Sequence, residues 1–584
     1  THCISSAASD VYKRQPPYDK LVSQNRRPVI GAIVGLIRKP AQHAIVGLIR
    51  KPVQHAIQEQ GTYACSSMTR QEKEQTHAEA EEHGEHGRTS MGEKIDQVLE
   101  PHLDEKSDNK LGHMLNKRHW RRFAWLEWGH IDPIKPEEQQ MRHPYVIALI
   151  WVSMNLNVLS FSTGMVAPDM GFEFRYFSYT TLGFLIGWAI FPAAFTIFGH
   201  KLGMRQMVHA RYSFGYFGAP VPALLTALTG LGYGILNAIV AGETLQAVSP
   251  HGSMSATVGI VIVTVMALAV SFCGIRVLNV LDMVFWLPVL ISFAILAGEA
   301  KTGPEGLHVL PQEPRPTARN VLGLGSLLSG FYVSYASMSS DISMYYHRDR
   351  SSWLLFVISW IALLFSAPPI LMLGAAFATS SQRVPAWNDA VSNNPSPGPL
   401  MNLVLSTHLG NFGKFLTVLI ALSAASNMMT SFYSIGLCFQ TALPPLRILP
   451  RFLFPLAATA IVLPLAIVGQ TSFYSTLSNF LSVIGYWSAL YVGVVIADFV
   501  VIRRCRMSSY DVSIWNDWRQ LPPGIAAMTS CVLSLGLVVP FMDQAWFTGP
   551  LGKHVGDLGF ELGLAVTIVL YCVLRPVEQR LFRR

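Results

Sequence analysis

The sequence predicts an all-α integral membrane protein with about twelve transmembrane helices. Its 584 residues are 51% hydrophobic and 14% charged, whereas roughly 25% charged residues is typical of a soluble domain. The apolar residues occur in runs of about 20, the length that a helix needs to cross a hydrocarbon core roughly 30 Å thick. Two of these runs contain many polar residues, which predicts that their helices are interrupted inside the membrane.

The region that precedes the first apolar run, residues 1–143, is hydrophilic, and we expect it to be cytosolic and largely disordered. A 12-residue unit, IVGLIRKPAQHA and then IVGLIRKPVQHA, repeats almost unchanged within it, and the sequence does not begin with Met. We therefore expect residues 1–67 to be extraneous, with Met68 or Met91 as the start. The apolar patches are shorter than the core of a secretory signal, so no cleaved leader is predicted.

A glutamate-rich stretch in the same region carries His77, His83 and His86. Histidines at such spacing could chelate a metal, but tracts of this composition are usually solvated. The seven Cys residues contain no CxxC motif and no regular spacing. We therefore predict neither a metal site nor disulfides.

The transporter-like domain is expected at residues 144–574, followed by a basic cytosolic tail at 575–584. The formal charge is +8, and its Lys and Arg residues stand mainly in short loops between apolar runs. This distribution indicates topology rather than nucleic-acid binding, and the excess on one side places both termini in the cytosol. The predicted spans are residues 144–166, 177–198, 219–241, 256–274, 280–298, 320–341, 353–378, 412–441, 452–469, 473–502, 523–541 and 557–574.

The two polar spans are the first and the sixth. Span one contains Asn155, Asn157 and Gly164, and span six contains Gly330 and ends near Asp341. For any one of these residues, close helix packing is the simpler explanation. Their clustering in corresponding spans instead favours broken helices around a binding site near the middle of the bilayer.

Span three places Tyr233 and Asn237 on one helical face, because they are four residues apart. An aromatic ring can stack on a planar heterocycle, while an amide offers a donor and an acceptor to its edge. The alternatives are an interfacial Tyr anchor and an Asn that joins two helices.

Ionisable residues inside the spans are candidates for ion coupling. We select Asp341 as the coupling or gating group because it closes the polar stretch of span six. The other acidic residues, Glu243, Asp282 and Asp498, lie near predicted helix ends, where we expect snorkelling or capping.

Several motifs resemble the fungal purine-cytosine permeases of the nucleobase-cation symporter family, over roughly residues 128–575. They are the span-one pattern, the loop GMRQMVHARYSFGYFG, and the stretches NFLSVIGYW, LPPGIAA and GDLGFELG. The span-one pattern consists of Trp151, Ser153, Asn155, Ser160, Gly164 and Pro168.

The resemblance implies a LeuT-type architecture: two inverted five-helix repeats at residues 144–298 and 320–502, and two extra helices at 523–574. It also implies uptake of purine nucleobases or cytosine with protons, sodium being the less favoured ion, and residence in the plasma membrane. No other cofactor is expected. The implied substrate contacts are Ser160, Tyr233, Asn237, Tyr335, Asn427 and Ser431.

Two departures bear on substrate choice. The family's usual Trp in span six falls at Tyr335, and its usual Pro-Asn pair in span eight falls at Thr430 and Ser431. A Ser cannot donate and accept along a purine edge as an Asn does. A carrier of another planar heterocycle, such as a vitamin B6 compound, is therefore the alternative.

Other functional classes are less favoured. The spans contain no paired carboxylates, HExxH motif, nucleophile elbow or phosphate loop, so no enzyme is predicted. A channel or a transceptor remains as the alternative from another class. The predicted partners are a small nucleobase and the lipid bilayer, not nucleic acid, and the sequence makes no prediction of oligomeric state.

Overall fold

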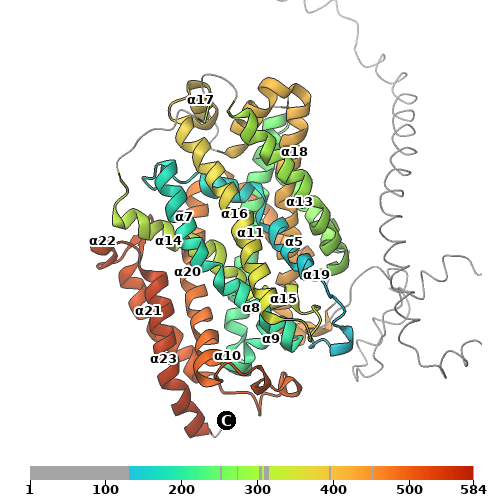
Figure 1. Ribbon diagram of the computed structural model, residues 1–584, viewed down its shortest axis with the longest axis vertical. Coiled ribbons are helices and arrows are strands. Elements are labelled where there is room, and N and C mark those ends of the chain that lie inside the picture. Colours follow the sequence, from blue (N-terminus) through green and yellow to red (C-terminus); the bar gives the residue numbers. More distant parts are fainter. Residues whose placement is uncertain are drawn as a thin grey trace, which may run out of the picture. The chain divides into compact units, whose positions relative to one another are not determined.

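The computed structural model describes residues 131–249, 253–272, 274–301, 306–307, 315–393, 396–449 and 452–582. The repeated unit, the histidine-containing stretch and both candidate start methionines lie outside these residues. The described part is helical apart from turns, loops and one short hairpin of β1 and β2 (Figure 1). The elements of the first half are α5 (Pro144–Asn155), α6 (Val158–Gly164), α7 (Phe174–Trp188), α8 (Ile190–Leu202), α9 (Gln206–His209), α10 (Arg211–Gly218), α11 (Pro220–Val248), α12 (Ala256–Ser271) and α13 (Gly274–Glu299).

The second half contains α14 (Ala318–Tyr332), η5 (Val333–Ser337), α15 (Ser339–Ser343), α16 (Ser352–Ser381), α17 (Pro385–Asn393), α18 (Pro397–Ala442), α19 (Leu453–Gly469) and α20 (Phe473–Ala497). After these come α21 (Ile525–Phe541), β1 (Asp543–Gln544), β2 (Phe547–Thr548), α22 (Gly552–Val555) and α23 (Gly559–Phe582).

Seven helices in the described part of the chain are long and apolar enough to cross a membrane, or eight if the bent pair α5–α6 is one span. Two further apolar helices, α12 and α21, are shorter, and α14 is separated from α15 by a 3₁₀ segment. A multi-pass membrane protein is therefore confirmed. The count of about twelve spans stays a prediction, because it depends on these short and interrupted helices.

The residues that directly precede the first predicted span are structured. Ile131 is buried, and the Gln139 side chain donates to the carbonyl oxygens of His200 and Met344. Met141 pairs with Tyr346 in an isolated bridge. Residues 131–143, the described part of the region that we expected to be largely disordered, are therefore held by main-chain and side-chain hydrogen bonds.

Helix α11 packs along α18, and this pair makes the most extensive helix contact of the described residues. Helix α16 covers α5, α6 and α8, and α20 lies against α14 and η5. Helices α21 and α23 pack on each other at one edge (Figure 1). The interrupted segments therefore lie inside the bundle, enclosed by continuous helices.

The segment between predicted spans seven and eight is also helical, and the sequence analysis did not predict these helices. It contains α17 and the first turns of α18, up to a kink at Gly410 (φ 53°). A non-glycine residue rarely adopts that backbone conformation. The kink separates these turns from the helix that follows, and only the latter is an apolar run long enough to be predicted as a span.

Glycines let the interrupted helices approach their neighbours closely. A Cβ atom at Gly330 would lie 1.7 Å from the carbonyl oxygen of Leu481, and one at Gly164 would lie 1.9 Å from that of Leu371. Both obstacles are backbone atoms, which cannot move aside as a side chain can.

We predict that Gly330→Val disrupts the packing of α14 on α20, because backbone atoms occupy the space that the new side chain needs. The matched control is Gly183→Ala, where nothing lies within 4 Å of the added Cβ. Fluorescence-detected size-exclusion chromatography should show aggregation of the Val variant and a single peak for the control. A single peak of wild-type stability for Gly330→Val would contradict this packing.

Candidate substrate site

Span one is broken into α5 and α6, whose axes differ by 58°. The break exposes carbonyl groups that a continuous helix would pair, and lipid offers them no partner. The Met154 carbonyl oxygen accepts from Asn157 Nδ2 at 2.5 Å and from Asn427 Nδ2 of α18 at 3.0 Å. Side chains from within the break and from a neighbouring helix therefore replace the missing helical bonds.

Three polar residues, Asn155, Asn157 and Ser160, also make hydrogen bonds within this break. Asn157 caps α6, because its Oδ1 accepts from the Ser160 backbone N–H at 2.9 Å. The Ser160 hydroxyl donates to the Asn155 carbonyl oxygen at 2.5 Å. The Asn155 Nδ2 donates to the carbonyl oxygen of Trp151 at 2.8 Å.

Span six is interrupted as well. Helix α14 ends at Tyr332, and the 3₁₀ segment η5 separates it from the short helix α15. The hydroxyl of Tyr233, on α11, donates to the Gly330 carbonyl oxygen at 3.1 Å and lies 3.4 Å from the Ser334 hydroxyl oxygen. Helix α11 thus supports the break in span six, as α18 supports the break in span one.

The two supporting helices meet through their amides. Asn237 Nδ2 donates to Asn427 Oδ1 at 3.3 Å and to the carbonyl oxygen of Tyr233 at 2.8 Å. The Ser431 hydroxyl donates to the same Asn427 oxygen at 3.5 Å. Two polar atoms of the residues gathered here, Asn237 Oδ1 and Trp151 Nε1, are buried without a hydrogen-bond partner among the residues that the structure describes. The cluster therefore has one acceptor and one donor to offer a ligand.

Aromatic rings form the rest of the cluster. The rings of Tyr233 and Tyr335 are parallel within 5°, with centroids 6.5 Å apart. Trp151 meets Tyr335 edge-on at 5.5 Å, and Phe480 meets Tyr233 edge-on at the same centroid separation. A flat ring between two others needs about 7 Å, two van der Waals gaps of about 3.5 Å. The tyrosines would have to move apart before a planar ring could stack between them.

Five of the six residues predicted as substrate contacts are joined in this cluster: Tyr233, Asn237, Tyr335, Asn427 and Ser431. Each of them is buried, so the cluster is closed to solvent in this conformation. Their role as substrate contacts stays a prediction. The sixth, Ser160, uses its proton to close the break in span one, which leaves only its oxygen lone pairs for a ligand.

Trp151 was part of the span-one pattern but was not predicted as a site residue. It is fully buried and is among the largest buried side chains of the described residues. A Trp that buries its N–H usually finds a hydrogen-bond partner for it. The feature of the sequence that could have indicated Trp151 is its position one helical turn before Asn155, with which the polar part of the span begins.

Asp341, the predicted coupling or gating group, lies in α15. Its Oδ1 accepts from the backbone N–H of Gln206, the first residue of α9, at 3.0 Å. The carboxylate therefore joins the second half of span six to the loop that follows α8. A gating role for Asp341 remains a prediction. Its position between α15 and α9 is compatible with that role.

The expectation for Asp282 was wrong. It lies within α13 and not at its end, and its side chain is buried. Asp282 Oδ1 accepts hydrogen bonds from Ser153 of α5, at 3.1 Å, and from Ser426 of α18. These serines directly precede Met154 and Asn427, whose contact supports the break in span one. Sequence position alone could not reveal this, because α13 extends further toward the N-terminus than the apolar run.

Glu243 was also expected to snorkel, but it is buried in α11 and faces Ser396. Asp498 follows the last residue of α20, as expected of a capping position, and it is buried. It accepts from Arg503 Nε at 2.7 Å and from the hydroxyls of Tyr510 and Tyr571.

We predict that Asn427→Ala lowers thermal stability in detergent, because it removes two buried hydrogen bonds, one to the Met154 carbonyl oxygen and one from the Asn237 amide. A buried hydrogen bond contributes about 0.5–1.5 kcal/mol. Asn402→Ala is the matched control, since Asn402 also lies on α18 and donates to an α11 carbonyl, that of Ala247, at 2.8 Å. It lies outside the cluster. An Asn427→Ala variant as stable as wild type would contradict this bridging role.

Comparisons with known proteins agree with this geometry. The family model for permeases for cytosine/purines, uracil, thiamine and allantoin matches residues 134–549. Purine-cytosine permease fcyB of Emericella nidulans is 30% identical over 462 residues, which covers 79% of this chain and 90% of that protein. Vitamin B6 transporter TPN1 of Saccharomyces cerevisiae is 25% identical over 531 residues, covering 79% and 91%.

Among solved structures, Mhp1, a nucleobase-cation-symport-1 family transporter in a closed conformation with bromovinylhydantoin bound, matches with a TM-score of 0.62. It is 16% identical, and the match covers 78% of this chain and 97% of that one. This likeness confirms the predicted LeuT-type fold. The family model spans well over half of the sequence, and the chain therefore belongs to the family of permeases for cytosine/purines, uracil, thiamine and allantoin.

Proposed function

We propose that the chain is a secondary active transporter that takes up purine nucleobases, cytosine or both, together with protons, by alternating access. The observation that carries this proposal is the closed cluster between the two breaks, with parallel phenol rings beside a buried amide acceptor that has no partner among the described residues. The relatives named as purine-cytosine permeases support the substrate class. We place the protein in the plasma membrane with both termini in the cytosol.

A nucleobase suits the cluster chemically. Its flat ring would stack between Tyr233 and Tyr335, and its ring or amino N–H would donate to Asn237 Oδ1. The N–H of Trp151 would meet a ring nitrogen or a carbonyl oxygen of the base. Both groups are buried without a partner in the described part of the protein, so a ligand that satisfies them gains specificity over one that does not.

We propose Asp282 as a proton-binding group. An ionisable residue inside the membrane is a functional-site hypothesis by default. None of the described basic side chains pairs with Asp282, and serine hydroxyls can act as donors or acceptors, so the trio of Ser153, Asp282 and Ser426 can hold the carboxylate in either protonation state. The two serines lie next to the residues that support the span-one break. A proton on Asp282 would thereby be linked to the substrate cluster.

Transport would follow from movement at the two breaks. Proton and substrate bind, one helix bundle rocks against the other, and the site opens to the cytosol. An inward membrane potential contributes about 2.3 kcal/mol per charge per 100 mV. Asp341, between α15 and α9, would act on the cytosolic gate.

We expect cells that lack their own nucleobase transporters to gain uptake of radiolabelled adenine or cytosine when they express this chain. Asn237→Ala should lose at least about tenfold of this uptake at unchanged surface expression, because it removes the free edge acceptor. Asn402→Ala is the control and should retain uptake. Competition by purines, pyrimidines and pyridoxine identifies the substrate, and a chain inhibited by pyridoxine alone would be a vitamin B6 carrier. Wild-type kinetics of Asn237→Ala would remove this cluster from the site.

Asp282→Asn should keep nucleobase binding but lose accumulation against a gradient, because the amide resembles the protonated acid and cannot release a proton. Uptake by the wild type should rise as the external pH falls and collapse with a protonophore. Asp389→Asn, an exposed change on α17, is the control. An Asp282→Asn variant that still accumulates substrate with wild-type pH dependence would exclude Asp282 as the coupling group.

A further inference from the structure

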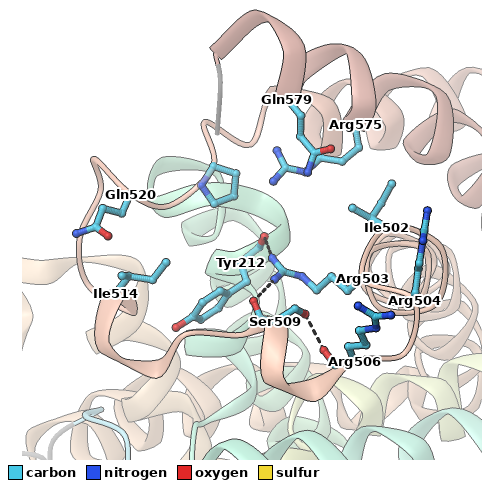
Figure 2. A pocket seen from close by; sticks show the side chains of 11 residues that line it. Tyr212, Ile502, Arg503, Arg504, Arg506, Ser509, Ile514, Gln520, Arg575 and Gln579 are labelled. Carbon is cyan, nitrogen blue, oxygen red and sulfur yellow. Dashed lines mark hydrogen bonds between the residues drawn. The ribbon is translucent and has the colours of Figure 1, made fainter.

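A second polar site lies away from the substrate cluster, where α10, the segment between α20 and α21, and the end of α23 come together. Its cavity has a volume of about 480 Å³, within the range of roughly 300–1,000 Å³ of small-molecule pockets. Figure 2 shows Arg575 and Gln579 entering it from α23, opposite Arg503 and Ser509. The lining residues are Tyr212, Ile502, Arg503, Arg504, Arg506, Ser509, Ile514, Gln520, Pro522, Arg575 and Gln579.

The lining carries four arginines and no carboxylate. The charges of two of the arginines are neutralised by carboxylates that do not line the pocket. Arg503 pairs with Asp498 at 2.7 Å, and Arg575 pairs with Glu578 at 2.5 Å. Among the described residues, no acidic side chain pairs with Arg504 or Arg506. The pocket therefore holds an excess of about two positive charges, which matches the charge of −1.5 to −2 on a phosphate monoester at pH 7.

The histidine that lies behind this wall adds no charge. His209 stacks near Tyr212 and Tyr510, and burial lowers its pKa to about 3. It is therefore neutral at cytosolic pH. The positive charge of the pocket comes from guanidinium groups, which stay charged and offer fork-shaped pairs of donors that fit phosphate oxygens.

The wall of the pocket is held in place before any ligand binds. Arg503 donates to the carbonyl oxygens of Ser509, at 2.7 Å, and Tyr212, at 3.3 Å (Figure 2). Its guanidinium lies 4.1 Å from the centre of the Tyr510 ring. Arg504 and Cys505 have φ angles of 51° and 57°. Non-glycine residues seldom adopt this left-handed conformation, and such strain tends to be kept at ligand sites.

One buried donor in the pocket has no partner. The side chain of Arg575 is 4% exposed, and its Nε is buried without a hydrogen bond in the described part of the protein. A donor of this kind normally has a partner, since its desolvation is otherwise uncompensated. An anion in the cavity would supply the acceptor.

The surroundings of the pocket are those of a membrane surface. Val501, next to the lining residue Ile502, is 50% exposed, and Leu581 and Phe582 at the end of α23 are 73% and 47% exposed. Apolar side chains that are exposed at the end of a spanning helix face lipid, and basic pockets at that depth suit phosphate-bearing headgroups.

We propose that this pocket is a binding site for a phosphate monoester, carried either by an anionic lipid headgroup at the membrane surface or by a soluble phosphate ester. The phosphate oxygens would accept from Arg504, Arg506 and the free Nε of Arg575, while Arg503 and Tyr212 shape the wall. This site is independent of nucleobase transport.

The test uses the purified full-length protein and the double variant Arg504→Gln/Arg506→Gln. Both arginines lie on the exposed rim, so the variant should fold. The matched control is Arg519→Gln/Arg580→Gln, which removes the same charge from exposed positions outside the pocket. Binding of inositol trisphosphate is measured in detergent, and binding of phosphatidylinositol 4-phosphate is measured in phosphatidylcholine nanodiscs.

We expect the wild type and the control to bind at least one probe with similar affinity, and the rim variant to bind it at least about tenfold more weakly. Binding of the lipid probe alone assigns the site to a headgroup, and binding of the soluble probe as well assigns it to the phosphate ester in general. Failure of both probes to bind the wild type, or an equal loss in the control, would overturn the proposal. Nucleobase uptake by the same variants decides separately whether the transporter itself is intact.

Discussion

The structure depends on satisfying backbone groups at two breaks inside a low-dielectric bundle. An unpaired carbonyl at that depth has neither water nor lipid partners, so protein side chains must supply its hydrogen bonds. Asn427 does so for the Met154 carbonyl in span one, and Tyr233 does so for the Gly330 carbonyl in span six. Both side chains come from the pair of long helices, α11 and α18, that pack on each other in the interior.

This arrangement explains why structural support and the proposed recognition use the same residues. Asn237 donates a hydrogen bond to Asn427, while its own Oδ1 is buried without a hydrogen-bond partner among the described residues. A ligand that enters between Tyr233 and Tyr335 would compete for these groups and would thereby alter the support of the breaks. Asp282 contacts the serines that precede Met154 and Asn427, so its protonation would act on the same supports.

Much of the fold was predictable because lipid imposes simple constraints on a sequence. The length of the apolar runs indicated the spans, and the polar residues and glycines of spans one and six indicated that these two helices are interrupted. The helices of residues 385–409 were missed because Pro, Asn and Ser interrupt their apolar residues, which leaves no apolar run long enough to span a membrane. Residues 131–143 were missed because long-range hydrogen bonds, such as those of Gln139, leave no local pattern.

The candidate site was predictable only in part. The spacing of Tyr233 and Asn237 indicated one helical face, and the family resemblance indicated Tyr335, Asn427 and Ser431. Ser160 was predicted as a substrate contact, although its proton closes a break, because spacing does not show which partner a hydroxyl takes. Asp282 was misjudged because its partners come from spans that are distant in sequence.

The most direct test of the central claim is an electron cryo-microscopy structure with adenine or cytosine bound. We predict density for a flat ring between Tyr233 and Tyr335, whose ring centroids should then lie about 7 Å apart, with one edge of the base at Asn237 Oδ1. Density for the base elsewhere, with the Asn237–Asn427 hydrogen bond and the closed tyrosine pair unchanged, would contradict it.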